Sequence, residues 1–109
     1  MRAQLLAAYV AKQGFAADQI GGTLPGSVYY AYVPSTNTYW AAATFVGSGT
    51  ATEQTMVTLQ DEGAEATFIR IGTGPWDVHI HALLWPCPGD LPVAVLAAWQ
   101  LAIVEGCAS

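Results

Sequence analysis

The chain has 109 residues, a usual size for one domain, and 53% of them are hydrophobic while 10% are charged. A chain this apolar can bury enough surface to offset the entropy of ordering, which excludes disorder. A formal charge of −5 with only three cations, Arg2, Lys12 and Arg70, argues against binding to nucleic acid or to anionic membranes.

The first predicted element is an alanine-rich helix over residues 3–13, which Gly14 ends. Its apolar side chains recur at helical spacing: Leu5, Leu6, Tyr9 and Val10. Residues 1–6 carry one cation but no sustained apolar stretch and no cleavage site, so we expect no signal peptide. Glycine and proline then indicate a loop over residues 21–26.

The middle of the chain predicts a sheet. Its strand-like segments are residues 28–33, 39–46, 54–60, 64–71 and 76–84. The turns between them, at residues 34–38, 47–49, 61–63 and 72–75, contain glycine, proline, asparagine or acidic residues. Consecutive strands joined by short turns most simply form an antiparallel meander of four or five strands.

The C-terminal part predicts a loop over residues 86–92 and a helix over residues 91–105, with Asp90 as its cap and Pro92 in its first turn. This helix is apolar nearly all round, so it needs cover on more than one side. Its uncharged run is shorter than the about 20 residues of a membrane-spanning helix, so no membrane insertion is expected. The fold class is therefore α+β: one domain over residues 1–109, with one N-terminal and one C-terminal helix.

Cys87 and Cys107 flank this predicted helix. A helix of about 14 residues holds its ends roughly 20 Å apart. A disulfide needs Cα atoms within about 7 Å. We therefore expect free thiols or an intermolecular bond; an intramolecular bridge would require a shorter helix or a tail that folds back. The redox compartment stays open.

The first candidate site is the alternating set Asp77, His79 and His81. Side chains two residues apart in a strand share one face, roughly 7 Å apart. Two imidazoles and a carboxylate suit zinc or iron, or acid/base chemistry. The alternative is that they are ordinary polar residues on a solvated face. No further ligand cluster stands out, so we expect no cofactor, and zinc is the ion considered.

The second candidate site is a set of aromatic residues around the first hairpin. The expected binding residues are Tyr30, Tyr32, Tyr39, Trp40 and Trp76. Tyrosine and tryptophan are enriched at interfaces and line ligand pockets. The alternative is cross-strand packing, which stabilises a sheet by up to ~1 kcal/mol per pair. Because neighbours in a strand point to opposite faces, at least one row of these rings is exposed or covered by a partner.

Nucleophilic catalysis has no motif in this sequence. No serine lies in a Gly-x-Ser-x-Gly elbow. Cys87 stands between two prolines with no adjacent cation to lower the pKa of its thiol, so we interpret it as structural.

Several turn and aromatic motifs occur together between residues 29 and 101. They are Tyr30-Ala31-Tyr32, Pro34 through Thr38, Tyr39-Trp40-Ala41, Phe68, Gly74-Pro75-Trp76 with Val78, Cys87, and Val95 through Leu101. With them, residues 29–101 resemble small domains that recur in uncharacterised exported proteins of actinobacteria. The resemblance covers roughly two thirds of the chain. It implies an exported or envelope-associated protein and brings no catalytic residues; without it, a cytoplasmic location is expected.

The low charge and the apolar last helix together predict a surface that is covered by something, most simply by a second copy of the chain. We therefore expect a non-enzymatic binding or interaction module that forms a homo-oligomer and takes a protein or a small apolar ligand. The rival is a small enzyme with a pocket between sheet and helices, in which His79, His81 and Asp77 act as acid/base groups or metal ligands.

Overall fold

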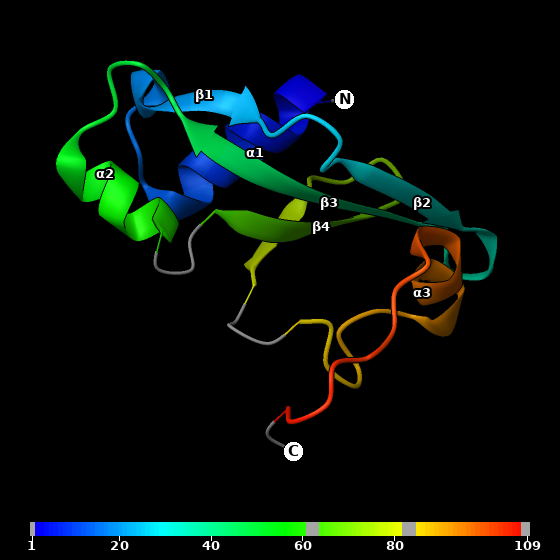
Figure 1. Cartoon of the computed structure of the whole chain (residues 1–109). Helices are drawn as coiled ribbons and strands as arrows, with labels where there is room; N and C mark the ends of the chain where they lie inside the picture. Colours follow the sequence, from blue (N-terminus) through cyan, green and yellow to red (C-terminus); the bar gives the residue numbers. More distant parts are fainter. Residues whose placement is uncertain (1, 61–63, 82–84, 108–109) are drawn as a thin grey trace.

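The computed structural model describes residues 2–60, 64–81 and 85–107. Its strands are β1 (Ile20–Thr23), β2 (Tyr29–Val33), β3 (Thr38–Gly47), β4 (Glu65–Ile71) and β5 (Asp77–Ile80). Its α-helices are α1 (Arg2–Gln13), α2 (Glu53–Thr58) and α3 (Val93–Trp99). The predicted class is confirmed: the strands form one antiparallel sheet, with a helix near each end of the chain (Figure 1).

The long strand β3 organises the sheet. The strand order is β1-β3-β4-β5, and β2 also pairs with β3. Along one edge of β3, Val33 of β2 faces Thr38 at one end and Thr23 of β1 faces Phe45 near the other. The sequence had placed β1 in a loop because of its two glycines. Gly22 has a φ of 136° and lies where the register shifts, so this strand depends on pairing with β3.

Residues 54–60 do not form the predicted strand, because α2 covers most of this segment. Thr52 caps the helix: its side chain accepts a hydrogen bond from the backbone N–H of Thr55. Thr55 and Leu59 are buried and lie four residues apart, which is the spacing of one helix face. The predicted turn at 61–63 and the end of the predicted strand, at 82–84, lie outside the described residues.

The C-terminal helix is shorter than predicted. It ends at Trp99, because Gln100 adopts the left-handed conformation with a φ of 57°. The following residues turn back, and the N–H of Val104 donates to the carbonyl of Pro86 at 2.8 Å. Cys107 thereby reaches Cys87, and the two form a disulfide with 5.8 Å between their Cα atoms. The prediction of unbridged cysteines is wrong because it assumed a long helix.

Asp90 does not cap α3, which is a further correction. Pro92 occupies the N-cap position and makes no side-chain capping bond. The carboxylate of Asp90 instead accepts a hydrogen bond from the N–H of Cys87 at 2.7 Å. Asp90 therefore closes the turn before the helix.

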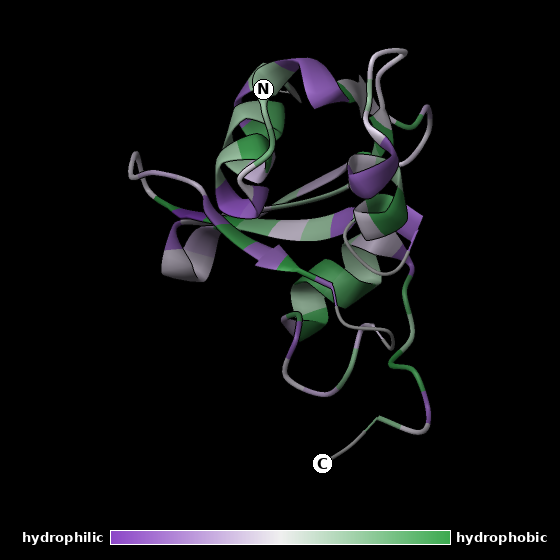
Figure 2. Ribbon diagram, turned by 90° about the vertical axis from the view of Figure 1, so that its left-hand side faces the viewer, coloured by the Kyte–Doolittle hydropathy of each residue, from purple (hydrophilic) through white to green (hydrophobic). Residues whose placement is uncertain are grey.

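The sheet carries a hydrophobic core on each face, and α1 and α3 lie on opposite sides of it (Figure 2). The core on the α1 face contains Leu5, Tyr9, Ile20, Ala41, Ala43, Phe45, Leu59, Ala66, Phe68 and Val78. The core on the α3 face contains Ala42, Leu91, Val95 and Trp99. Only one side of α3 is covered in the single chain: Val93 is 82% exposed. Among the described residues, no helix is long and apolar enough to cross a membrane.

Candidate functional site

A pocket of about 420 Å³ lies over the hairpin of β2 and β3. We call it the aromatic groove; it is lined by Tyr30, Ala31, Tyr32, Tyr39, Trp40 and Trp76. All five aromatic residues that the sequence singled out line this pocket, but the side chains of four of them share the α1 face of the sheet, whereas that of Trp40 lies on the α3 face. They come from β2, from β3 and from the residue before β5.

Strand register places the tyrosines of the aromatic groove. Tyr32 lies opposite Tyr39, and their ring centroids are 4.6 Å apart at a tilt of 35°. The hydroxyl of Tyr32 donates to the side-chain oxygen of Asn37 at 2.8 Å. Asn37 has a φ of 49° and ends the short 3₁₀ turn between the strands. The turn thus holds one wall of the groove.

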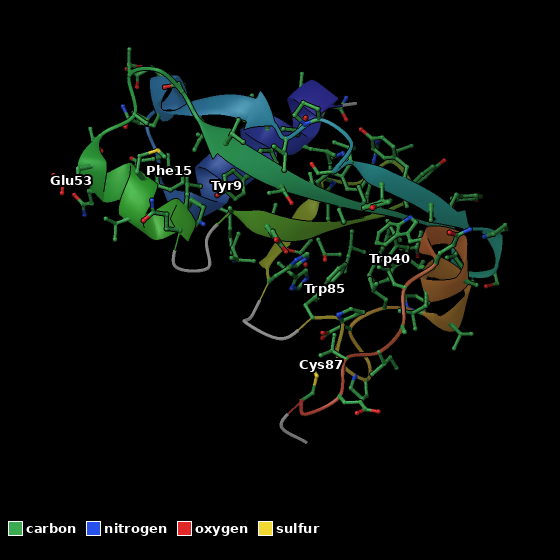
Figure 3. The ribbon with its side chains drawn as sticks, in the orientation of Figure 1. Tyr9, Phe15, Trp40, Glu53, Trp85 and Cys87 are labelled. Carbon is green, nitrogen blue, oxygen red and sulfur yellow. A yellow bond between two sulfur atoms is a disulfide. The ribbon has the colours of Figure 1, made fainter. Side chains whose placement is uncertain are left out.

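Trp76 and Trp40 are held from different sides. The indole N–H of Trp76 donates to the side-chain oxygen of Gln4 in α1 at 3.3 Å, and its ring meets Phe68 edge-on at 6.4 Å. Trp40 packs against the core on the α3 face, and Figure 3 shows it beside α3. Trp40 consequently lines the aromatic groove and also a pocket on the α3 face.

The chemistry of the aromatic groove is that of neutral rings. Of the described residues that line it, none carries a charged side chain. Its side-chain polar groups are phenol hydroxyls and indole N–H groups, and those of Tyr32 and Trp76 already have protein partners. Ring faces and edges therefore supply most of the surface offered to a ligand.

A second pocket, of about 400 Å³, contains both histidines, and we call it the histidine pocket. It is lined by Trp40, Thr67, Ile69, His79, Ile80, His81, Trp85, Gly89 and Asp90. Trp40 and Trp85 both lie on the side of the sheet that carries α3 (Figure 3). His79 lies opposite Thr67 in the register of β4 and β5.

The two histidines have different surroundings. His79 is exposed, and its Nε2 lies 3.1 Å from the carboxylate of Asp77, which is also exposed. His81 is buried and stacks on Trp85, with ring centroids 3.9 Å apart at 13°. Burial lowers the pKa of His81 from its ordinary value, and the nearby Glu65 carboxylate opposes that change.

Both ring nitrogens of His81 have protein partners. Its Nε2 lies 2.5 Å from the hydroxyl oxygen of Thr67, and its Nδ1 lies 3.5 Å from a carboxylate oxygen of Glu65. Because an ionised carboxylate only accepts, Nδ1 carries the proton toward Glu65 and Nε2 accepts from Thr67. Sequence reasoning missed Thr67. Glu65 and Thr67 lie in the predicted strand over residues 64–71, but only the cross-strand register brings them to His81.

A zinc site at Asp77, His79 and His81 stays the alternative that the sequence raised. In residues 2–60, 64–81 and 85–107, no group of three or more His, Cys, Asp or Glu side chains is placed to hold a metal. Asp77 and His79 contact each other, whereas His81 is occupied by Thr67 and Glu65. The three expected ligands therefore do not converge on one point.

The resemblance to exported actinobacterial domains also stays a prediction. It concerns residues 29–101, which include the aromatic groove, the histidine pocket and Cys87. No protein-family model, no curated protein and no solved structure matches this chain.

Proposed function

We propose that the protein is a binding module whose aromatic groove takes a proline-rich peptide in the polyproline II conformation. The observation that supports this is a pocket of about 420 Å³ lined by five aromatic residues, with the side chains of Tyr30, Tyr32, Tyr39 and Trp76 on one face of the sheet. Proline-rich peptides dock in aromatic-lined grooves because their extended helix is already formed and loses little entropy on binding.

The polarity of the aromatic groove favours a peptide over a sugar. A sugar presents many hydroxyls, and each one that is buried without a partner costs free energy. The groove offers few unengaged donors and acceptors, since Tyr32 and Trp76 are already bonded. A proline ring needs no such partner. The formal charge of −5 further favours a peptide with a basic residue beside its prolines.

Titration with a decaproline peptide that ends in arginine tests this proposal. We expect saturable binding and a change in tryptophan fluorescence, since Trp40 and Trp76 line the groove. Tyr30→Ala should weaken binding at least tenfold. Tyr29→Ala is the matched control, because Tyr29 is its neighbour on the opposite face and is 43% exposed against 42% for Tyr30. No binding by the folded protein, or equal losses in both variants, would contradict the proposal.

Self-association is part of the same proposal. Exposed apolar side chains support it: Val93 on α3 is 82% exposed and Ile71 at the end of β4 is 71% exposed. A second copy that covers α3 would remove this surface from water. Sedimentation should detect a homodimer that Val93→Glu weakens. A monomer at high protein concentration would contradict it.

We further propose an exported location. The disulfide between Cys87 and Cys107 supports it, because disulfides persist mainly in oxidising compartments. Fractionation of cells that make the protein, with thiols alkylated before lysis, should find it outside the cytoplasm with both cysteines protected. A cytoplasmic protein with alkylated cysteines would contradict this location.

The rival function, an enzyme that uses Asp77, His79 and His81, is favoured by one observation. Both histidines line a pocket of about 400 Å³. Elemental analysis of the purified protein decides whether these residues hold zinc. A stoichiometric metal would replace the binding-module proposal with a metalloenzyme.

A further inference from the structure

A hydroxyl and an imidazole of the histidine pocket, those of Thr67 and His81, lie in line with the carboxylate of Glu65 beside the pocket. The distances are 2.5 Å from Thr67 Oγ1 to His81 Nε2 and 3.5 Å from His81 Nδ1 to Glu65 Oε2. From this geometry we infer a nucleophilic site that hydrolyses small neutral esters, with Thr67 as nucleophile, His81 as general base and Glu65 as the residue that positions His81. Such sites are recognised by geometry and roles, on unrelated folds.

The backbone holds these three residues in place. Glu65 and Thr67 lie two residues apart in β4, so their side chains share one face of the sheet. The N–H of His81 donates to the carbonyl of Glu65 at 3.0 Å, which extends the pairing of β4 and β5. The ring of His81 is fixed by its stacking on Trp85. A side chain held on several sides keeps the orientation that proton transfer needs.

The position of His81 suits a general base. Its side chain is buried beside Thr67, and a neutral imidazole nitrogen facing a hydroxyl can accept its proton. Its Nε2 is the nitrogen that faces the hydroxyl of Thr67. The nucleophile and the base are therefore already within hydrogen-bond reach.

The pocket restricts the substrate to small neutral esters. The pocket is compact, at about 400 Å³, and Thr67 is only 4% exposed, so a short acyl group reaches its hydroxyl more readily than a long one. Trp40, Ile69 and Trp85 provide apolar walls. The carboxylates of Asp90 and Glu65 lie at or beside the pocket and repel anionic substrates.

The reaction balances with water as co-reactant. Thr67 Oγ attacks the ester carbonyl carbon and its proton moves to His81 Nε2. The tetrahedral intermediate collapses, the bond to the alcohol oxygen breaks, and that oxygen takes the proton from His81. Water then attacks the acyl-threonine and gives a proton to His81. Release of the carboxylic acid returns the proton to Thr67.

The test measures hydrolysis of p-nitrophenyl acetate by the disulfide-bonded protein. The tests are made in a His79→Gln background, because an exposed imidazole hydrolyses activated esters by itself. In this background, Thr67→Val should lower the rate of ester hydrolysis at least tenfold, whereas Thr67→Ser should retain or raise that rate. An unchanged rate in a Thr67→Val protein with a native near-ultraviolet circular dichroism spectrum would overturn the inference.

A covalent probe tests the nucleophile without relying on a variant that folds. A fluorophosphonate should add to the unaltered protein at Thr67, located by peptide mass spectrometry. Absence of an adduct at Thr67 overturns the inference.

The positioning role of Glu65 is tested separately. Glu65→Gln should lower the rate of hydrolysis and also shift its pH profile to lower pH, since Glu65 raises the pKa of His81. An unshifted profile would remove Glu65 from the site. Thr67, His81 and Glu65 do not line the aromatic groove, so a failure of peptide binding leaves this inference standing.

Discussion

Cys87 and Cys107 are twenty positions apart in sequence, yet their Cα atoms are 5.8 Å apart and a disulfide joins them. The segment that they close carries α3, whose Val95 and Trp99 pack on the sheet. Gly89 and Asp90 of the same segment line the histidine pocket, and Trp85, two residues before Cys87, stacks on His81. The disulfide therefore holds together a C-terminal unit that covers one face of the sheet and forms one wall of the histidine pocket.

Replacement of both cysteines by serine should destabilise the protein. A closed loop with a sequence separation of 20 corresponds to about 3 kcal/mol in the chain-entropy description. Urea unfolding followed by tryptophan fluorescence should show a lower midpoint. Reduction of the unaltered protein is the control and should give the same shift. An unchanged midpoint would show that the packing of α3 alone determines the stability of this unit.

Tyr9 and Phe45 should contribute strongly to stability. Their rings stack with centroids 4.0 Å apart at 10°, and both side chains are fully buried between α1 and the sheet. Tyr9→Ala should cost about 3–5 kcal/mol of unfolding free energy, because it removes a buried ring. Tyr9→Phe keeps the ring and should cost about 1 kcal/mol for the lost hydroxyl. Similar losses in both variants would assign the effect to the hydroxyl rather than to stacking.

Stability should fall on mild acidification because of His81. Burial lowers the pKa of His81 in the folded protein, so the unfolded chain binds this proton more readily. The stability that His81 contributes is fully present above its pKa in the unfolded chain, about 6.5. It is lost as the pH falls through the pKa of His81 in the folded protein. Urea midpoints from pH 7.5 downward should show this loss, and His81→Gln should reduce it. His79→Gln is the control that should retain it, since His79 is exposed.

Gln19 should anchor α2. Its side-chain oxygen accepts from the N–H of Thr52 at 2.7 Å and from the hydroxyl of Thr55 at 3.0 Å. Gln19→Ala leaves both donors without this acceptor and should cost about 1–3 kcal/mol. Gln19→Glu keeps an acceptor and should cost less. Hydrogen exchange at the backbone of α2 measures the effect, and equal exchange in both variants would contradict the anchoring role.

Much of the aromatic groove was predictable because its residues are close in sequence. The hairpin of β2 and β3 has a short turn, so alternation along each strand places Tyr30, Tyr32 and Tyr39 on one face. The contact of Thr67 with His81 was not predictable. It depends on the register of β4 against β5 and on the burial of a residue just beyond the end of a strand. No pattern within one segment contains that information.

The sequence by itself determined the elements whose signals are local and long: α1 with its terminal Gly14, the hairpin of β2 and β3, and the α+β class. Tertiary structure decided the rest. The pattern of residues 54–60 fits both a strand and one face of a helix. In the structure the segment is helical, and the hydroxyl of Thr55 donates a hydrogen bond to the side-chain oxygen of Gln19. The end of α3 at Trp99 and the disulfide depend on a chain that returns to Pro86. Short segments have periods that fit more than one structure, so the partner against which they pack selects between them.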